Sequence, residues 1–339
     1  MTRHLDLRPF ALAVGALAAC GDPATARTLV VGPGLAFAVP SQAAREAAEG
    51  DTVTIAPGTY FDCAIWQASR LTIRGTGLDV VITDRACAGK AAFVIQGNDV
   101  TVSGLTFQRI RVPDGNGAGI RAEGRNLTVR DSRFVNNQVG ILAGTGGTLL
   151  ITGSTFSANR GGSEEQPLPA VLAGAPDLLR IEHSVFEQAR GGLHIRSSAQ
   201  RTDLVDNHLS DEGGGMTGPL VLIDGGIVTL TGNAIDLAPE AAPRPGAVLV
   251  RGDADAIAVR GNTLIEPKGD VPLLRNWSGA GATQGGNDVP PNVAAVSDDG
   301  AMYHRLRSRA ADLRAAARDA VGTARYNVAG LARLLGLLP

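Results

Sequence analysis

The stretch Leu127-Thr-Val-Arg-Asp-Ser-Arg-Phe134 carries a phrase that recurs along most of the chain. Its template is apolar, any, apolar, two mostly polar or small residues, a small or amide residue, any, and apolar. Apolar residues at alternate positions predict a strand with one buried face rather than a helix. The other copies are Val53–Tyr60, Leu71–Leu78, Val100–Phe107, Leu149–Phe156, Leu179–Phe186, Thr202–Leu209, Val228–Ile235 and Ile257–Leu264.

The copies start 18 to 30 residues apart. A repeat of this size is typical of a solenoid, in which each unit packs only on its neighbours. Because the repeated unit is a strand, successive copies must stack in parallel, which predicts an all-β, parallel β-helix of nine or ten coils. A second recurring strand precedes many copies, with two inward apolar residues around one outward residue; its members are Gly119–Gly124, Gly140–Gly144, Ala170–Gly174, Leu193–Ser197, Val221–Gly225 and Val248–Gly252.

Turn residues agree with this interpretation. The chain has 44 glycines in 339 residues, roughly double the usual share, as a coil with several bends requires. The sixth position of the phrase is Asn207, Asn233 and Asn262 in the last three copies. We interpret these asparagines as turn residues whose side chains hydrogen-bond along the stack.

Composition restricts the partners. The net charge of −2 gives no argument for a nucleic-acid partner. Aromatic residues make up 4% of the chain, so a sugar-binding surface built from a row of stacking rings is not expected.

Residues 1–26 have the features of an export signal: Arg3 and Arg8 provide a basic start, and Phe10–Ala19 is a short apolar run. Two processing sites compete. Ala24-Thr25-Ala26 is a cleavage pattern, whereas Leu17-Ala18-Ala19-Cys20 has the shape of a bacterial lipobox. Both predict an exported protein, periplasmic or secreted, and the second adds a lipid anchor at Cys20.

Cys63 and Cys87 are 24 residues apart, close to the length of one coil. Adjacent coils stack about 4.8 Å apart, within the Cα–Cα range of a disulfide. An oxidising compartment permits the bond, so we predict a Cys63–Cys87 disulfide.

The stretch Gly50-Asp-Thr-Val-Thr-Ile-Ala-Pro-Gly-Thr-Tyr60 opens the run of repeats. It resembles the start of right-handed parallel β-helix repeat proteins of the pectin-lyase-like superfamily. Tyr60-Phe-Asp-Cys63, Thr83–Cys87, Pro113–Val129 and Asn136–Gly144 also match, and the resemblance extends over about residues 28–290. Within the superfamily the chain is similar to an exported proteobacterial group without an assigned activity, so the resemblance implies the fold but no reaction.

The two ends differ from the repeats. Pro40–Ala48 is Ala-rich and predicts a short helix that covers the first coil. Residues 299–336 predict an amphipathic, Arg-rich helix after the β-helix domain of residues 28–290. This helix could cap or lie along the solenoid, dock a protein partner, or contact an anionic surface.

The second strands supply the candidate site, because their outward residues form columns across the coils. Aligning these strands gives one column of Val94, Arg121, Leu142, Leu172, His194, Leu222 and Leu249. Its apolar character predicts an exposed patch that meets the C-terminal helix, a partner protein or a second copy. The next column is Gln96, Glu123, Gly144, Gly174, Arg196, Asp224 and Arg251.

The polar members of these columns define two groups. Arg121 and Glu123 lie on one coil, and they are candidate ligand-binding residues together with Arg251. An Arg196–Asp224–Arg251 ladder could hold a uronate carboxylate bidentately, or it could be a solvated charge ladder. His194 beside it is a candidate general base, although an exposed His more often has no such role.

Three functions remain open. The first is an exported envelope protein that binds polysaccharide. The second is a polysaccharide lyase or epimerase that uses His194, Arg196 and Asp224. The third is a structural or assembly protein that docks a partner. No cofactor is expected, since Pro113-Asp-Gly-Asn-Gly117 could suggest calcium but has so few acidic residues that we interpret it as a turn.

Overall fold

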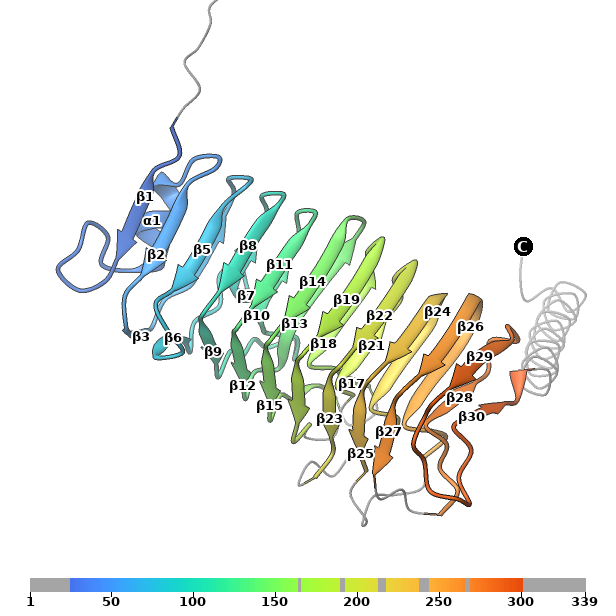
Figure 1. Ribbon diagram of the computed structural model, residues 1–339. Coiled ribbons are helices and arrows are strands. Elements are labelled where there is room, and N and C mark those ends of the chain that lie inside the picture. The colour runs from blue at the N-terminus through green and yellow to red at the C-terminus, as the bar shows by residue number, and fades with distance from the viewer. Residues whose placement is uncertain are drawn as a thin grey trace, which may run out of the picture.

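The computed structural model describes residues 25–163, 166–189, 193–212, 218–237, 244–265 and 269–300. They form a right-handed parallel β-helix of about ten coils, which confirms the predicted fold (Figure 1). The expected export signal, apart from its last two positions, lies outside the described residues, as do the lipobox at Cys20 and the C-terminal helix beyond residue 300. Within the described residues, no helix is long and apolar enough to cross a membrane.

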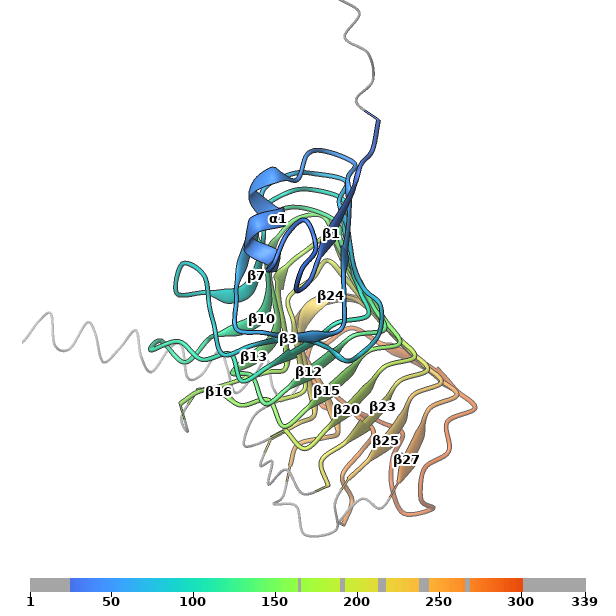
Figure 2. The same cartoon turned by 90° about the vertical axis from the view of Figure 1, so that its left-hand side faces the viewer.

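Each coil contributes strands to three faces around a common interior. The first face holds the second recurring strand, the second face holds the start of the repeated phrase, and the third face holds its end (Figure 2). The first two faces belong to one 19-stranded sheet, and the third is a separate nine-stranded sheet.

The strands have the following bounds. The first face contains β4 (Ala64–Trp66), β7 (Ala91–Ile95), β10 (Ala118–Ala122), β13 (Val139–Thr145), β18 (Val171–Ala175), β21 (Ile195–Ser197), the starts of β24 (Val221–Thr231) and β26 (Val248–Arg260), β28 (Leu274–Asn276) and β30 (Val296–Asp298). The second face contains β1 (Thr28–Val31), β2 (Thr52–Ile55), β5 (Thr72–Gly75), β8 (Val100–Ser103), β11 (Leu127–Arg130), β14 (Thr148–Thr152), β19 (Leu178–Glu182), β22 (Arg201–Val205), the ends of β24 and β26, and β29 (Ala282–Gly285).

The third face contains β3 (Gly58–Tyr60), β6 (Val80–Thr83), β9 (Thr106–Gln108), β12 (Arg133–Val135), β15 (Thr155–Ser157), β20 (Val185–Glu187), β23 (His208–Ser210), β25 (Ala234–Asp236) and β27 (Thr263–Ile265). A small antiparallel hairpin, β16 (Gly161–Gly162) with β17 (Pro167–Leu168), leaves the coil before the first face and projects from the side of the solenoid (Figure 2).

A stack of aromatic side chains runs through the interior of the solenoid. The last apolar position of the phrase places Phe107, Phe134, Phe156 and Phe186 on four successive coils, all fully buried. Their rings stack with centroid separations of 5.3, 4.8 and 4.6 Å. The in-register stacking of strands therefore places identical side chains on one another, and these four phenylalanines form a continuous part of the core.

The turn between the second and third faces holds the predicted asparagine ladder. The backbone N–H of Asn207 donates to Oδ1 of Asn233 at 3.0 Å, and that of Asn233 donates to Oδ1 of Asn262 at 2.9 Å. Nδ2 of Asn233 also donates to the carbonyl oxygen of Leu204. These buried amides satisfy turn groups that water cannot reach, so the predicted stacking of the asparagines is confirmed.

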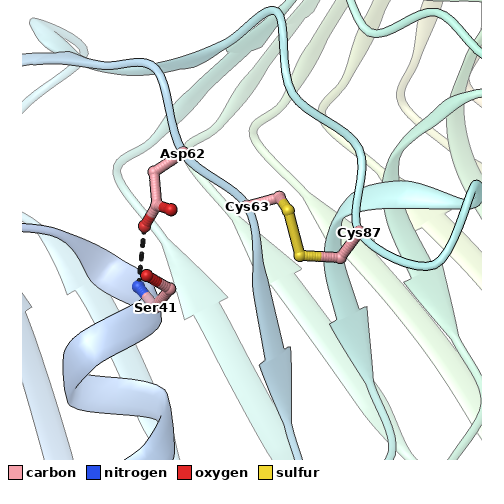
Figure 3. The surroundings of a disulfide bond; sticks show 4 residues. All are labelled: Ser41, Asp62, Cys63 and Cys87. Carbon is pink, nitrogen blue, oxygen red and sulfur yellow. Dashed lines mark hydrogen bonds between the residues drawn. A yellow bond between two sulfur atoms is a disulfide. The ribbon is translucent and has the colours of Figure 1, made fainter.

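The first coil is covered by α1 (Pro40–Glu46), the short helix expected there. It buries Pro40, Ala43 and Ala44 against the end of the core. No side chain of the preceding residue caps this helix; instead Oδ2 of Asp62 accepts a hydrogen bond from the backbone N–H of Ser41 at 2.7 Å (Figure 3). The cap and the coil are thus joined where the first-turn N–H groups need acceptors.

The predicted disulfide is present. Cys63 and Cys87 are bonded with their Cα atoms 5.4 Å apart, and the bond joins the loop before β4 to the loop before β7 (Figure 3). Cys87 also packs against a small apolar cluster on the outside of the first face, around Ala91 and Val94. The bond therefore fastens an outer loop as well as two neighbouring coils.

We expect the double variant Cys63→Ser/Cys87→Ser to unfold at lower temperature and lower denaturant concentration. The bond closes a loop of 24 residues, and losing such a constraint costs roughly 3 kcal/mol in the chain-entropy model. Calorimetry of the variant and of the reduced wild type would check this. A variant as stable as the oxidised wild type would contradict it.

We expect Asn233→Ala to lower the free energy of unfolding by about 1 to 3 kcal/mol, because buried turn groups lose their partners. Asn287→Ala is the matched control, since Asn287 ends the ladder and is only half-buried. Chemical denaturation would measure both. Equal losses at the two positions would show that the ladder's burial is not what matters.

Candidate functional site

Three charged side chains of the predicted ladder form a cluster on the first face. Asp224 on β24 lies between two arginines on neighbouring coils. Its Oδ2 is 3.2 Å from Nε of Arg196 on β21, and its Oδ1 is 2.5 Å from Nε of Arg251 on β26. The three residues are therefore neighbours, as the predicted Arg196–Asp224–Arg251 ladder requires.

The register of the ladder differs from the alignment made on the sequence. Arg196 pairs with Leu172 on one side and Leu222 on the other, whereas Asp224 pairs with Arg251. Arg196 thus stands in the column of the leucines, two residues along the strand from the column of Asp224. The long arginine side chain bridges that offset, so the cluster forms diagonally across the coils.

Asp224 engages one edge of each guanidinium group. It accepts a hydrogen bond from Nε of Arg196 and from Nε of Arg251. Nε is the guanidinium nitrogen nearest the aliphatic part of the side chain. The two arginine side chains are 41% and 36% exposed, against 23% for Asp224. One carboxylate shared by two guanidinium groups leaves a local positive charge with donor atoms open to solvent.

The two arginines line a cleft of about 780 Å³, which we call the arginine cleft. Its apolar lining comes from side chains of the first face and of two outer loops. The lining residues are Pro113, Asp114, Gly115, Gly162, Ser163, Gln166, Pro167, Leu168, Leu193, Arg196, Leu222 and Arg251. The volume is within the range typical of ligand sites.

The loop wall of the cleft is fixed to the solenoid by polar contacts. The backbone N–H of Gly162 in the hairpin donates to the carbonyl oxygen of Gly115 at 2.8 Å. Oε1 of Gln138 accepts from the backbone N–H groups of Val112 and Gly117 at 2.8 and 2.7 Å. The Pro113–Gly117 segment therefore acts as a braced turn in the wall.

The expected outward position of His194 is wrong. Its side chain is fully buried, Nε2 lies 2.7 Å from the carbonyl oxygen of Ser210, and the ring packs against Phe186 at a centroid separation of 5.8 Å. The chain bends at His194 just before β21, and the bend turns the side chain inward. A general base must reach a proton on its substrate, so His194 is removed from the candidate site.

Arg121 and Glu123 form a separate cluster at β10. Glu123 lies 2.5 Å from Nζ of Lys90, 3.1 Å from Nε2 of Gln96 and 3.9 Å from Nε of Arg121. The hydrogen bond from Lys90 is the main cause that lowers the pKa of Glu123. Three strand steps, about 14 Å, separate β10 from β21, and neither residue lines the arginine cleft.

The apolar column is not the exposed patch that the sequence predicts. Val94, Leu222 and Leu249 are 1%, 8% and 5% exposed. Outer loops return over this face, and Cys87 and Leu168 pack in the same small cluster as Leu142 and Leu172. Val94 therefore lies in a second, external cluster beneath an outer loop, whereas Leu222 borders the arginine cleft.

Sequence reasoning missed Asp114, Leu168 and Leu193 as lining residues of the cleft. Asp114 and Leu168 come from segments that follow no repeat, so periodicity carried no signal for them. Leu193 belongs to a predicted strand copy, but it precedes β21 (Ile195–Ser197), which starts two residues later than predicted. Within the described residues, no group of three or more His, Cys, Asp or Glu side chains could hold a metal ion.

Burial lowers the pKa of His194 from its ordinary value to about 4, partly offset by the Ser210 carbonyl and by Asp211. In the unfolded chain the His194 ring is therefore protonated below about pH 6.5, whereas in the folded protein it is protonated only below about pH 4. We expect stability to be full above pH 6.5 and to fall between pH 6.5 and 4. The loss is on the order of 3 kcal/mol.

Denaturant unfolding at several pH values would measure this slope. His194→Asn should be less stable at neutral pH but should have a flatter profile across that window, whereas exposed His208→Asn should keep the wild-type slope. An unchanged slope in His194→Asn would contradict the assignment.

Among solved structures the chain is similar to an alginate lyase from Paenibacillus sp. str. FPU-7, at 13% identity and a TM-score of 0.47 over 81% of this chain and 98% of that one. It is also similar to pectin methylesterase from carrot, at 11% identity and a TM-score of 0.45 over 82% and 90%. The rice weevil pectin methyl esterase follows, at 10% identity and a TM-score of 0.40 over 76% and 84%.

None of the curated protein sequences matches the chain. The family model described as right handed beta helix region matches residues 62–237. This is more than half of the 339 residues, and it spans the coils with the most regular phrases. The protein therefore belongs to the right-handed β-helix family.

Proposed function

We propose that this is an exported protein that binds acidic polysaccharide in the arginine cleft. One observation carries the proposal: Arg196 and Arg251 share the single carboxylate of Asp224 and line the same cleft of about 780 Å³. Asp114 also lines the cleft, but among the described residues it forms no ion pair with either arginine. The two guanidinium groups therefore keep donors for the anion of a ligand. A uronate residue of a polysaccharide carries such a carboxylate.

The geometry of the arginines suits a carboxylate better than a neutral group. Asp224 holds each guanidinium by Nε, so the planar Nη ends can serve a second oxyanion. Arginine forks bind carboxylates with paired, charge-assisted hydrogen bonds. Because Asp224 already orients both forks, less side-chain freedom is lost when the ligand binds.

The rest of the cleft suits a sugar chain. Leu168, Leu193 and Leu222 contribute apolar surface beside the arginines, and the C–H face of a pyranose can lie on such side chains. The cleft crosses several coils, since its lining runs from the turn before β10 to β26. That extent favours a polymer over a small ion.

Binding is favoured over lyase or epimerase chemistry. Both reactions need a base that takes the C5 proton of the uronate, and His194, the candidate from the sequence, is fully buried. A role in assembly through an exposed apolar column is also weakened, because Val94, Leu222 and Leu249 are buried.

Export is supported by two independent features. The Cys63–Cys87 disulfide fits an oxidising compartment. The basic start and short apolar run of residues 1–26 fit a signal for secretion. An extracytoplasmic location would place the cleft where polysaccharides occur.

We expect the protein to bind polygalacturonate and alginate in the arginine cleft, with affinity that falls as salt is added, and neutral dextran should not displace them. The double variant Arg196→Gln/Arg251→Gln should lose about tenfold or more, since hydrogen bonds to charged groups contribute about 1.5 to 3 kcal/mol. Isothermal titration calorimetry would measure the affinities.

Arg121→Gln is the matched control, because Arg121 is a half-exposed arginine of the first face outside the cleft. It should bind as the wild type does, and circular dichroism should show that all variants are folded. The proposal would be refuted if the wild-type protein bound neither uronate polymer, or if the double variant bound them with the wild-type affinity.

A further inference from the structure

A second hollow lies at the turn between the second and third faces, across the solenoid from the arginine cleft. Its volume is about 330 Å³, and we call it the corner groove. It is lined by Gly77, Leu78, Gly104, Asp131, Ser132, Arg133, Gly153 and Thr155. All of these come from four successive coils, and none belongs to the arginine cleft.

An irregular turn makes one wall of the groove. The chain passes from β8 to β9, from β11 to β12 and from β14 to β15 through two residues each, but from β5 to β6 through residues 76–79. Leu78 in this longer turn is 37% exposed. Its carbonyl oxygen accepts a hydrogen bond from Oγ1 of Thr106 at 2.7 Å, so the wall is fastened to the next coil.

Glycines make the floor. Gly104 and Gly153 occupy the first turn position with φ of +65° and +59°, and Asp131 lies between them at the same position with φ of +46°. A Cβ on Gly153 would approach Oδ1 of Asp131 to 2.7 Å. The carboxylate of Asp131 therefore lies in space that only a glycine at position 153 leaves open.

The groove is lined by two side chains of opposite charge, Asp131 and Arg133, that are not paired with each other. In the described part of the chain, the side chains of Asp131 and Arg133 form no ion pair within 4.0 Å, with each other or with any neighbour. The equivalent turn position further along the stack behaves differently, because Asp206 lies 3.7 Å from Nε2 of His183. Arg133 stands between Thr106 and Thr155 in the sheet register.

These features fit adjacent hydroxyl groups. A carboxylate only accepts hydrogen bonds and a guanidinium only donates them, whereas a hydroxyl does both. Two neighbouring hydroxyls of a sugar ring can therefore donate to Asp131 and accept from Arg133, and the ring's C–H face can rest on Leu78. The opposite charges of the pair cancel, so the groove gives no preference for an anion.

We propose that the corner groove is a binding site for a neutral sugar ring, separate from the arginine cleft. The proposal does not depend on the function assigned to that cleft. The volume of about 330 Å³ is at the lower end of ligand sites, which suits one or two sugar units.

The test is a titration of ¹⁵N-labelled protein with maltotriose, mannotriose and galactobiose, followed by NMR. At least one sugar should shift the backbone amides of Gly104, Asp131 and Gly153. Gly153→Ala should weaken that sugar by about tenfold, since the methyl group displaces the Asp131 carboxylate and its charged hydrogen bond is lost. Arg133→Gln should weaken it similarly.

Gly232→Ala is a matched control for backbone strain. Gly232 has φ of +67°, and a Cβ there would meet Oδ1 of Asp206 at 2.0 Å, but this turn lies outside the groove. It should keep the sugar affinity, as should Arg196→Gln/Arg251→Gln. Absence of shifts at the groove with all three sugars, or equal losses in Gly153→Ala and Gly232→Ala, would overturn the proposal.

Discussion

The structure depends on in-register stacking of parallel strands, which places each side chain about 4.8 Å from its equivalent in the next coil. Inward positions must then be occupied by groups that pack against their own kind. Phenyl rings meet this condition by stacking, as Phe134, Phe156 and Phe186 do at 4.8 and 4.6 Å. Asparagine amides meet it by donating to one neighbour and accepting from the other, so that a polar group is tolerated in the turn at full burial.

The same constraint explains how much the sequence could predict. Each copy of the phrase keeps its alternation of apolar and polar residues, because a shift by one residue would turn the buried side chains toward solvent. The strands and their order could therefore be predicted from the sequence. The disulfide was readable because 24 residues is close to one coil. The error at His194 arose where alternation ends. Its neighbours in the register are Ala170 and Leu220, both buried, and that apolar pair was the signal for an inward position.

The paths of the loops could not be predicted in this way, because their lengths vary and they share no repeated sequence pattern. The column from Val94 to Leu249 alternates as an outward column should, yet it is covered. A periodic pattern reports which side of a strand a residue lies on, but not whether another segment returns over that side. The apolar character of the column was the correct clue to burial at Val94, where Cys87 of an outer loop of this chain packs in the same cluster.

Both candidate sites occur where one coil departs from the rule that its neighbours follow. In the arginine cleft the departure is Arg196, which stands between Leu172 and Leu222 in the sheet register. In the corner groove it is a longer turn beside two glycines. The coil that carries Gly104 continues into the turn at Gly115, and the coil that carries Gly153 continues into the hairpin at Gly162. Coupling between sites requires an element with two discrete arrangements. Strands held in register on both sides by their neighbours provide one arrangement, so we expect ligands at the two proposed sites to bind independently.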